Sequence, residues 1–193
     1  MTSPKITPEK LDPRVKRTRG VLESAFLELT QEKGFQAVTV QDITERAGVN
    51  RATFYAHFAD KYALLDYSVR QGFLQEVEKR MLNTCHLTRE NLRSLIVAVC
   101  EYTRAVNGHC KPAQAQFESL VEAQVKAVLH ELLLNWLEPV KLKVAPETAA
   151  TAASWAIYGL ALQWSHAKHP RKVEEFAAEV LPLVAGNLGE SRD

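Results

Sequence analysis

Apolar residues recur three and four positions apart along almost all of this 193-residue chain, and this spacing constrains the fold more than any other feature. Residues spaced in this way share one face of an α-helix. No stretch sustains the alternation of apolar and polar residues, rich in β-branched side chains, that is typical of a strand. The chain is therefore predicted to be all-α, with about nine helices.

Composition and charge are those of an ordinary globular protein. Hydrophobic residues make up 46% of the chain and charged residues 24%, and the net charge is +1. This composition supplies a core and lacks the charge excess of a disordered chain. The first 20 residues are more basic, with six Lys and Arg against two Asp and Glu. We interpret residues 1–12 as a flexible basic arm, which fits either a polyanionic partner or a solvated tail.

Cysteine usage and the N-terminal sequence predict a cytoplasmic protein. The three cysteines form no C-x-x-C pair, so neither a disulfide framework nor a zinc ribbon is indicated. Residues 1–20 lack the continuous apolar stretch of a signal peptide. Residues 148–167 carry no charged side chain but are too polar for a membrane span, so we expect them to form a helix that is buried on all sides.

Capping residues and helix breakers divide the chain into helices. Asp12 followed by Pro13 marks a helix start and Gly34 a helix end, which predicts a first helix over 13–33. Thr39 and Asn50 then precede two short helices, and Asp60 precedes a long one. The longer helices are expected at about 61–83, 89–106, 112–137, 147–168 and 173–188, and the range 112–137 is either one helix or two.

The two short helices are separated by the four residues 47–50, Ala-Gly-Val-Asn. Gly48 can adopt the left-handed conformation that ends one helix, and Asn50 can cap the next helix at once. A turn of this length holds two helices at a steep angle. The sequence therefore predicts a helix-turn-helix.

The second short helix has a surface suited to a DNA groove. On a helical wheel of residues 51–58, Phe54 and Phe58 point to the core, whereas Ala52, Thr53 and Ala56 form a small opposite face. A helix with small outer side chains can approach a partner closely, as insertion into a major groove requires. The alternative is an ordinary helical subdomain with polar surface residues.

Hydrogen-bond donors flank this small face. Tyr55 and His57 are placed to donate to phosphates, and Arg51 can reach a base edge or a phosphate. Amides at the helix starts near Thr39 and Lys61 would add two further phosphate contacts.

Residues 39–65, T-V-Q-D-I-T-E-R-A-G-V-N-R-A-T-F-Y-A-H-F-A-D-K-Y-A-L-L, resemble the DNA-binding region of the TetR family of bacterial regulators. The resemblance extends from about Val15 through Leu65 and includes the A-G-V turn, the T-F-Y-x-H-F helix and the D-K start of the next helix. Beyond about Ser68 the chain shows only the length and helical layout of the family.

The resemblance implies a homodimer whose recognition helices enter successive major grooves of a palindromic operator. It places Thr39, Tyr55, His57 and Lys61 at phosphates, and Arg51, Ala52 and Thr53 near the bases. The predicted DNA-binding site consists of these residues together with Asn50, which begins the recognition helix.

The resemblance also implies an effector pocket and a dimer interface, and hence three regions: the arm at 1–12, a DNA-binding domain at 13–66, and an effector-binding and dimerisation domain at 67–193. The last two helices of the family pair with their copies in the other subunit as a four-helix bundle, and small residues between 149 and 161 would allow such an approach. The alternative is the central helix of a monomeric core. The expected dimer residues are Trp155, Ala156, Gly159, Leu160, Gln163, Leu181 and Val184.

The effector pocket is expected among the helices between 89 and 137. Candidate lining residues are Cys100, Tyr102, His109, Cys110, Gln114, Phe117, His130 and Trp136. Aromatic residues at helical spacing are also common in plain cores. Cys100, His109 and Cys110 could alternatively bind a metal or sense oxidants, although their spacing fits no known ligand pattern.

The function predicted from these features is that of a dimeric transcriptional regulator, a repressor that a small-molecule effector releases from its operator. A ligand-independent DNA-binding regulator or a chromosome or division-control protein of the same fold is the alternative. The chain lacks G-x-S-x-G, H-E-x-x-H and a glycine-rich phosphate loop, so we expect no enzyme activity, no catalytic residue, no metal and no cofactor.

Overall fold

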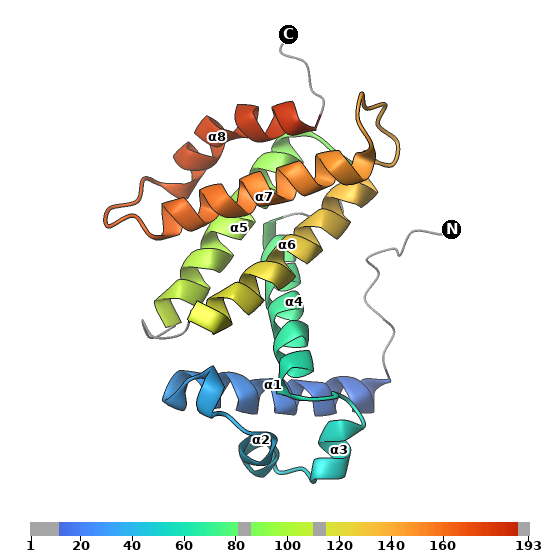
Figure 1. Ribbon diagram of the computed structural model, residues 1–193, viewed down its shortest axis with the longest axis vertical. Helices are drawn as coiled ribbons and strands as arrows, with labels where there is room; N and C mark the ends of the chain where they lie inside the picture. Colours follow the sequence, from blue (N-terminus) through green and yellow to red (C-terminus); the bar gives the residue numbers. More distant parts are fainter. Residues whose placement is uncertain (1–11, 81–85, 110–114, 189–193) are drawn as a thin grey trace. The chain divides into compact units, whose positions relative to one another are not determined.

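A computed structural model describes residues 12–80, 86–109 and 115–188 of this protein. These residues form eight α-helices and one 3-10 turn, with no strand among them, so the predicted all-α class is confirmed. In chain order the elements are α1 (Pro13–Lys33), the 3-10 turn η1 (Phe35–Ala37), α2 (Val40–Ala47), α3 (Arg51–Tyr55), α4 (Lys61–Arg80), α5 (Arg89–His109), α6 (Ala115–Leu137), α7 (Pro146–Ser165) and α8 (Val173–Asn187), as Figure 1 shows.

The starts of α1 to α5 follow the predicted caps, α6 is described from Ala115 and α7 begins at Pro146 without a side-chain cap, and two helix ends differ from the prediction. α5 continues past the expected stop at Asn107 and Gly108 to His109. α7 ends at Ser165, three residues before the expected end at Lys168. The indole nitrogen of Trp164 donates a hydrogen bond of 2.9 Å to the carbonyl of Arg171, which holds the following loop back against the helix end.

The described chain divides into two compact units. The head unit comprises residues 12–69 and 115–121, and the body unit comprises residues 70–80, 86–108 and 122–188. The first turns of α6 thus belong with the head unit, although they lie far from it in the sequence. Each unit has its own buried core.

The core of the head unit is rich in aromatic residues. Phe26 and Phe35 are fully buried with their rings edge to face and 6.0 Å apart. α2 packs on α1, and α3 follows α2 after the turn. The other buried members include Leu22, Leu29, Ile43, Phe54, Phe58, Leu64 and Leu65.

The body unit buries mostly aliphatic residues from α5, α6, α7 and α8. α7 and α8 pack side by side (Figure 1). No helix in the described parts of the chain combines the length and the apolar character needed to cross a membrane. Within a single chain residues 148–167 are not buried on all sides, because Trp155 in the middle of α7 is 62% exposed. Their full burial would require a second chain, as the expected dimer interface would provide.

Candidate nucleic-acid interface

The turn between α2 and α3 is built by the residues that the sequence singled out. Gly48 has a φ of 66° and a ψ of 31°, in the left-handed region, and so ends α2. Its amide donates to the carbonyl of Glu45 at 3.2 Å, and the amide of Val49 donates to the carbonyl of Thr44 at 3.0 Å. The next residue, Asn50, already caps α3. A side chain at position 48 would be strained because Cβ disfavours this backbone conformation.

α3 is short and is fixed at its start by Asn50. The side-chain oxygen of Asn50 accepts hydrogen bonds from the amide of Thr53 at 2.7 Å and from the Thr53 hydroxyl at 2.9 Å. This oxygen is therefore used for capping. The expected contribution of Asn50 to the site is the placement of α3.

The two faces of α3 differ as the helical wheel predicts. Phe54 is fully buried and Phe58 nearly so, and their ring centroids lie 5.9 Å apart. Arg51, Ala52 and Ala56 are exposed, and Thr53 is half-buried. The outward surface of α3 thus consists of small side chains with one arginine at the helix start.

Two polar aromatic side chains lie beside this surface. Tyr55 is 50% exposed, and its ring meets that of Phe54 edge to face with centroids 5.4 Å apart. His57 is half-buried, and its ring centroid is 6.5 Å from that of Phe58. Packing against the buried phenylalanines limits the rotamers of both side chains.

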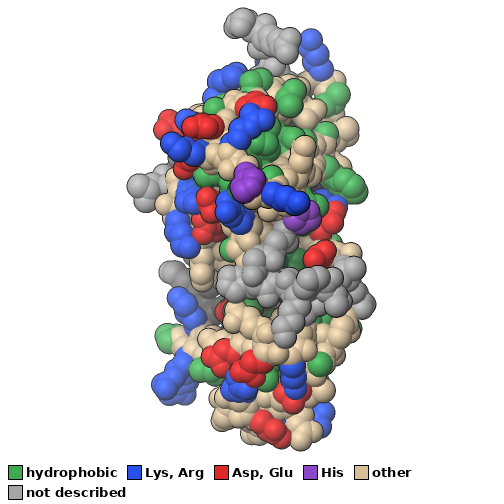
Figure 2. All heavy atoms as spheres, turned by 90° about the vertical axis from the view of Figure 1, so that its left-hand side faces the viewer, with side chains coloured by type: hydrophobic (Ala, Val, Ile, Leu, Met, Phe, Trp, Pro, Cys, Tyr) green, Lys and Arg blue, Asp and Glu red, His purple; other side chains and the backbone are tan. Residues whose placement is uncertain are grey.

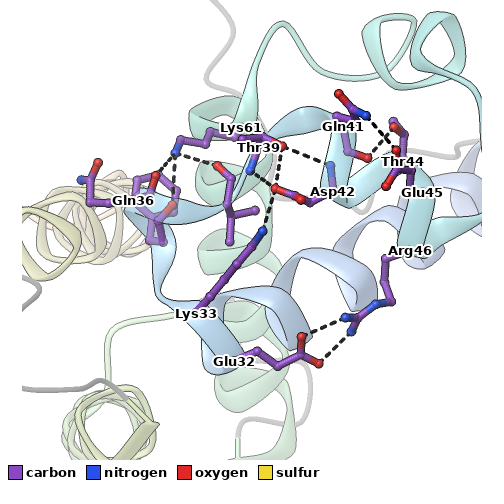
Figure 3. A network of polar contacts seen from close by, with 12 residues as sticks. Glu32, Lys33, Gln36, Thr39, Gln41, Asp42, Thr44, Glu45, Arg46 and Lys61 are labelled. Atoms are coloured by element: carbon purple, nitrogen blue, oxygen red, sulfur yellow. Dashed lines mark hydrogen bonds and ion pairs between the residues drawn. The ribbon is translucent and has the colours of Figure 1, made fainter.

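The start of α2 holds a closed network of polar contacts (Figure 3). The amide and the hydroxyl of Thr39 donate to a carboxylate oxygen of Asp42 at 2.8 and 2.5 Å, and the Asp42 amide donates to the Thr39 hydroxyl at 3.2 Å. Lys33 forms an ion pair of 2.8 Å with Asp42. The hydrogen bond from Lys33, followed by those from Thr39, holds the pKa of Asp42 well below its usual range.

This network changes how the start of α2 can meet a phosphate. Both donors of Thr39 are directed to Asp42, so the hydroxyl contact implied by the resemblance would require the capping box to open. The next amides, of Val40 and Gln41, are at the first positions of the helix, where an amide has no partner within the helix. These two amides are the donors that the geometry leaves for an anion at this point.

The first amides of α4 are capped by a carboxylate. One carboxylate oxygen of Asp60 accepts from the amides of Tyr62 and Ala63, both at 2.8 Å. A carboxylate in this position repels a phosphate. The amide contact expected at the start of α4 therefore finds no support in the geometry.

Lys61 is directed back toward η1. Its ammonium donates to the backbone carbonyls of Phe35, Gln36 and Val38 at 3.1, 3.1 and 2.9 Å (Figure 3). Burial lowers the pKa of Lys61 from its ordinary value. The phosphate contact implied by the resemblance would require these three bonds to break.

Further charges join α2 to α1. Arg46 forms ion pairs with Glu28 at 3.1 Å and Glu32 at 2.8 Å. The hydrogen bond from Arg46 lowers the pKa of Glu32.

Figure 2 shows basic and acidic side chains interspersed over one face of the molecule. Net charge alone therefore does not mark a DNA-binding surface on that face.

The sequence analysis missed the part that Arg19 plays in the head unit. Its guanidinium carbon lies 5.8 Å from the ring centroid of Phe58 and 5.3 Å from that of Tyr67. Arg19 thus packs α1 against Phe58, which lies three residues after the end of α3. The signal was available, since Arg19 precedes the buried Leu22 and Phe26 by three and seven residues and so shares their helix face.

The candidate effector residues are divided between the two units. Cys100 and Trp136 are buried and Tyr102 is half-buried in the body unit, whereas Phe117 is in the head unit with its ring 5.6 Å from that of Phe35. His130 is half-buried. The side chain of His109 lies outside the described part of the chain, as do Cys110 and Gln114.

Cys100 does not have the surroundings of a reactive thiol. It is fully buried, and burial, with a smaller effect of Glu101, raises its pKa to about 12. Redox-sensing thiols are exposed and have low pKa values. Within the described residues, no group of three His, Cys, Asp or Glu side chains is arranged to hold a metal ion.

The candidate dimer residues also separate by exposure. On α7, Trp155, Gly159 and Gln163 are exposed, and Ala156 and Leu160 are half-buried. On α8, Val184 is fully buried and Leu181 is 9% exposed, so both contribute to the core of their own chain. Leu183, which was not among the expected dimer residues, is a large apolar side chain of α8 that is 62% exposed.

These features define a helix-turn-helix with an exposed second helix. Residues 23–67 match the family model of bacterial regulatory proteins, tetR family. This stretch of the chain is thus similar to that family, in agreement with the resemblance seen in the sequence.

Individual relatives agree with this assignment. The chain is 37% identical over 71 residues to the HTH-type transcriptional regulator YxbF of Bacillus subtilis, covering 36% of this chain and 19% of YxbF. It is 28% identical over 123 residues to the tetracycline repressor protein class G of Vibrio anguillarum, covering 60% of this chain and 58% of that repressor. The chain thus spans from about a fifth to three fifths of the length of these curated relatives.

Similarity to a solved structure covers nearly the whole chain. The TetR family repressor FadR of Thermus thermophilus, solved in complex with lauroyl-CoA, matches 91% of this chain and 97% of its own chain with a TM-score of 0.57 and 22% identity. At this identity the match establishes the fold. The matched fold includes residues of the body unit as well as of the head unit.

Proposed function

We propose that this chain is a cytoplasmic homodimer that represses transcription by inserting α3 into the major groove of a palindromic operator. The observation that carries the proposal is the exposed surface of α3, where Ala52 and Ala56 lie opposite the buried Phe54. Small outer side chains let the helix backbone approach the base edges. The proposed domains are 13–66 for DNA binding and 67–193 for effector binding and dimerisation.

The side chains around this surface are given distinct roles. Arg51 is exposed at the start of α3, where it can donate to a base edge in the groove. Tyr55 and His57 flank the small face and donate to phosphates, which fixes the position of the helix on the duplex. The first amides of α2, at Val40 and Gln41, supply a further phosphate contact.

Dimerisation is assigned to the exposed side of α7 and α8. Trp155 and Leu183 are each 62% exposed, and large apolar side chains in such positions are typical of an interaction surface. The ammonium of Lys126 lies 3.6 Å from the ring centroid of Trp155, which covers part of the ring within the subunit. Pairing with a second copy would bury the remainder and place two recognition helices on one DNA molecule.

A small-molecule effector is proposed to act through the body unit. A relative named tetracycline repressor protein, and a repressor of the same fold solved in complex with lauroyl-CoA, support a ligand-responsive function. A coupling free energy of about 1 to 3 kcal/mol between effector and operator would change operator affinity roughly 5- to 150-fold. Operator DNA must then change effector affinity by the same factor. A compound bound equally well with and without DNA is no effector, and a screen that yields only such compounds favours ligand-independent regulation.

The interface is tested by comparing Arg51→Ala with Tyr55→Phe. Arg51→Ala should relax the preference for one or two base pairs in each half-site, by about 1 to 3 kcal/mol. Tyr55→Phe should weaken binding to all sequences alike, because a phosphate contact carries no sequence information. Fluorescence anisotropy with operator and scrambled duplexes measures both effects.

Tyr62→Phe is the matched control, since it removes an exposed tyrosine hydroxyl from the same unit and keeps the ring beside Phe35. It should bind DNA as the wild type does. Wild-type affinity in both Arg51→Ala and Tyr55→Phe would show that α3 is not the element that reads DNA.

A further inference from the structure

Lys61 is the first residue of α4, but its side chain serves a segment more than twenty residues earlier. Its ammonium is within 3.1 Å of three carbonyl oxygens, those of Phe35, Gln36 and Val38. An ammonium group has three N–H donors. The three carbonyls therefore account for its full donor capacity, and each bond is strengthened by the charge.

The surroundings favour this position over one in solvent. The Lys61 nitrogen lies 4.7 Å from the ring centroid of Phe35 and 5.8 Å from that of Tyr62, so two aromatic rings add cation–π attraction. Phe35 itself is fully buried. The side chain of Lys61 is thus held between an aromatic core and the carbonyl groups of residues 35, 36 and 38.

The anchored segment leads directly into α2. Val38, the last of the three acceptors, precedes Thr39, the N-cap of α2, which has a φ of −111° and a ψ of 159°. The direction in which the chain leaves Val38 determines where the first amides of α2 point. Lys61 therefore controls the geometry of the amides at Val40 and Gln41 from a position on another helix.

We propose that Lys61 is a positioning residue for DNA binding: it fixes the backbone of residues 35–38 so that the start of α2 meets a phosphate, and its own ammonium does not contact DNA. This inference rests on the proposed DNA-binding function. It replaces the direct phosphate contact that the resemblance to the TetR family implies for Lys61.

Two variants separate positioning from direct contact. Lys61→Met removes the charge and the three donors and keeps a flexible chain of similar length. Lys61→Arg keeps the charge, but the donors of its planar fork cannot reach three separate carbonyls from one nitrogen as an ammonium does. A direct phosphate contact would survive in Lys61→Arg, whereas the clamp on residues 35–38 would not. Lys143→Met, which removes an exposed lysine of the body unit, controls for the loss of one charge.

The first measurement is the thermal midpoint of unfolding without DNA. We expect Lys61→Met and Lys61→Arg to lose at least about 4 °C, while Lys143→Met keeps the wild-type value. The second measurement is the slope of log K against log salt concentration for a duplex selected by the wild type. This slope is negative, and loss of a direct phosphate contact makes it less steep by about 0.9. We expect the slope of Lys61→Met to match that of Lys143→Met.

The third measurement asks whether Lys61 acts through the start of α2. Val40→Pro removes one amide donor, and proline is tolerated at the first position of a helix. At a temperature where every variant is folded, Lys61→Met should weaken DNA binding about tenfold in the wild-type background and less than about threefold in the Val40→Pro background. It should remain about tenfold in an Arg51→Ala background, because Arg51 belongs to a different contact.

The outcomes distinguish this inference from the proposed function. A lowered thermal midpoint in a protein that binds no DNA at any salt concentration would reject the proposed function. Three results together, in a protein that binds DNA, would overturn the positioning role of Lys61 and leave the proposed function standing. These are an unchanged midpoint, a salt slope less steep by about 0.9, and additive effects of Lys61→Met and Val40→Pro.

Discussion

At the scale of single residues, Asp42 connects the folding of the head unit to pH. Its carboxylate accepts from Thr39 and pairs with Lys33, and its pKa lies well below the ordinary value of 3.8. A carboxyl group whose pKa is lowered by folding stabilises the folded state above its ordinary pKa. That contribution is lost as the pH falls below the ordinary value.

Asp42→Asn should therefore destabilise the protein at neutral pH. The difference in the free energy of unfolding between the wild type and Asp42→Asn should narrow as the pH is lowered from about 6 to about 3, because the Asp42 carboxyl becomes protonated in the unfolded chain while it stays ionised in the folded wild type. Urea unfolding at a series of pH values measures the difference. A gap of constant size over this range would show that the charge of Asp42 does not stabilise the fold.

Local residue chemistry explains why the caps could be predicted and the lysine contacts could not. The side chains of Asp12, Thr39 and Asn50 accept hydrogen bonds from amides two or three positions later. Their capping roles can therefore be predicted from the local sequence. The acceptors of Lys61 are backbone carbonyls 23 to 26 residues earlier. Every residue has a backbone carbonyl, so the sequence does not show which carbonyls will bind a lysine. These three come close to the ammonium only when the head unit is packed.

At the scale of elements, the first turns of α6 are part of the core of the head unit. Phe117 is 8% exposed, and its ring lies 5.6 Å from that of Phe35. The sequence analysis assigned Phe117 to an effector pocket because aromatic residues at helical spacing suit either a pocket or a core. The periodicity of a helix identifies its apolar face but not the element against which that face packs.

Phe117→Ala should destabilise the head unit. The loss of a buried phenylalanine costs about 3 kcal/mol in the free energy of unfolding, and hydrogen exchange of the amides in residues 35–38 should accelerate. Phe176→Ala, a half-buried phenylalanine of the body unit beside Trp164, is the control and should leave exchange at 35–38 unchanged. If Phe117→Ala also leaves it unchanged, the ring does not support η1.

At the scale of the whole molecule, the helical class and the local structure of the head unit could be predicted from the sequence, whereas the packing of the body unit could not. The turn and caps of α2 and α3 depend on neighbouring residues. The surface of α7 and α8 depends on how two long apolar helices rotate against each other, and for this reason Leu181 and Val184 were placed outward although they are buried. The helix pair leaves Trp155 and Leu183 at the surface instead.

The central claim is that a dimer reads DNA through two copies of α3, and selection of bound duplexes from a random DNA pool tests it most directly. The wild-type protein should enrich an inverted repeat whose half-sites are about one helical turn apart, roughly 10 base pairs or a multiple of this. A variant with Trp155→Asp and Leu183→Asp should lose the dimer in light scattering and should lose this enrichment. Enrichment of a single unrepeated motif, or of none, by the wild-type protein would contradict the claim.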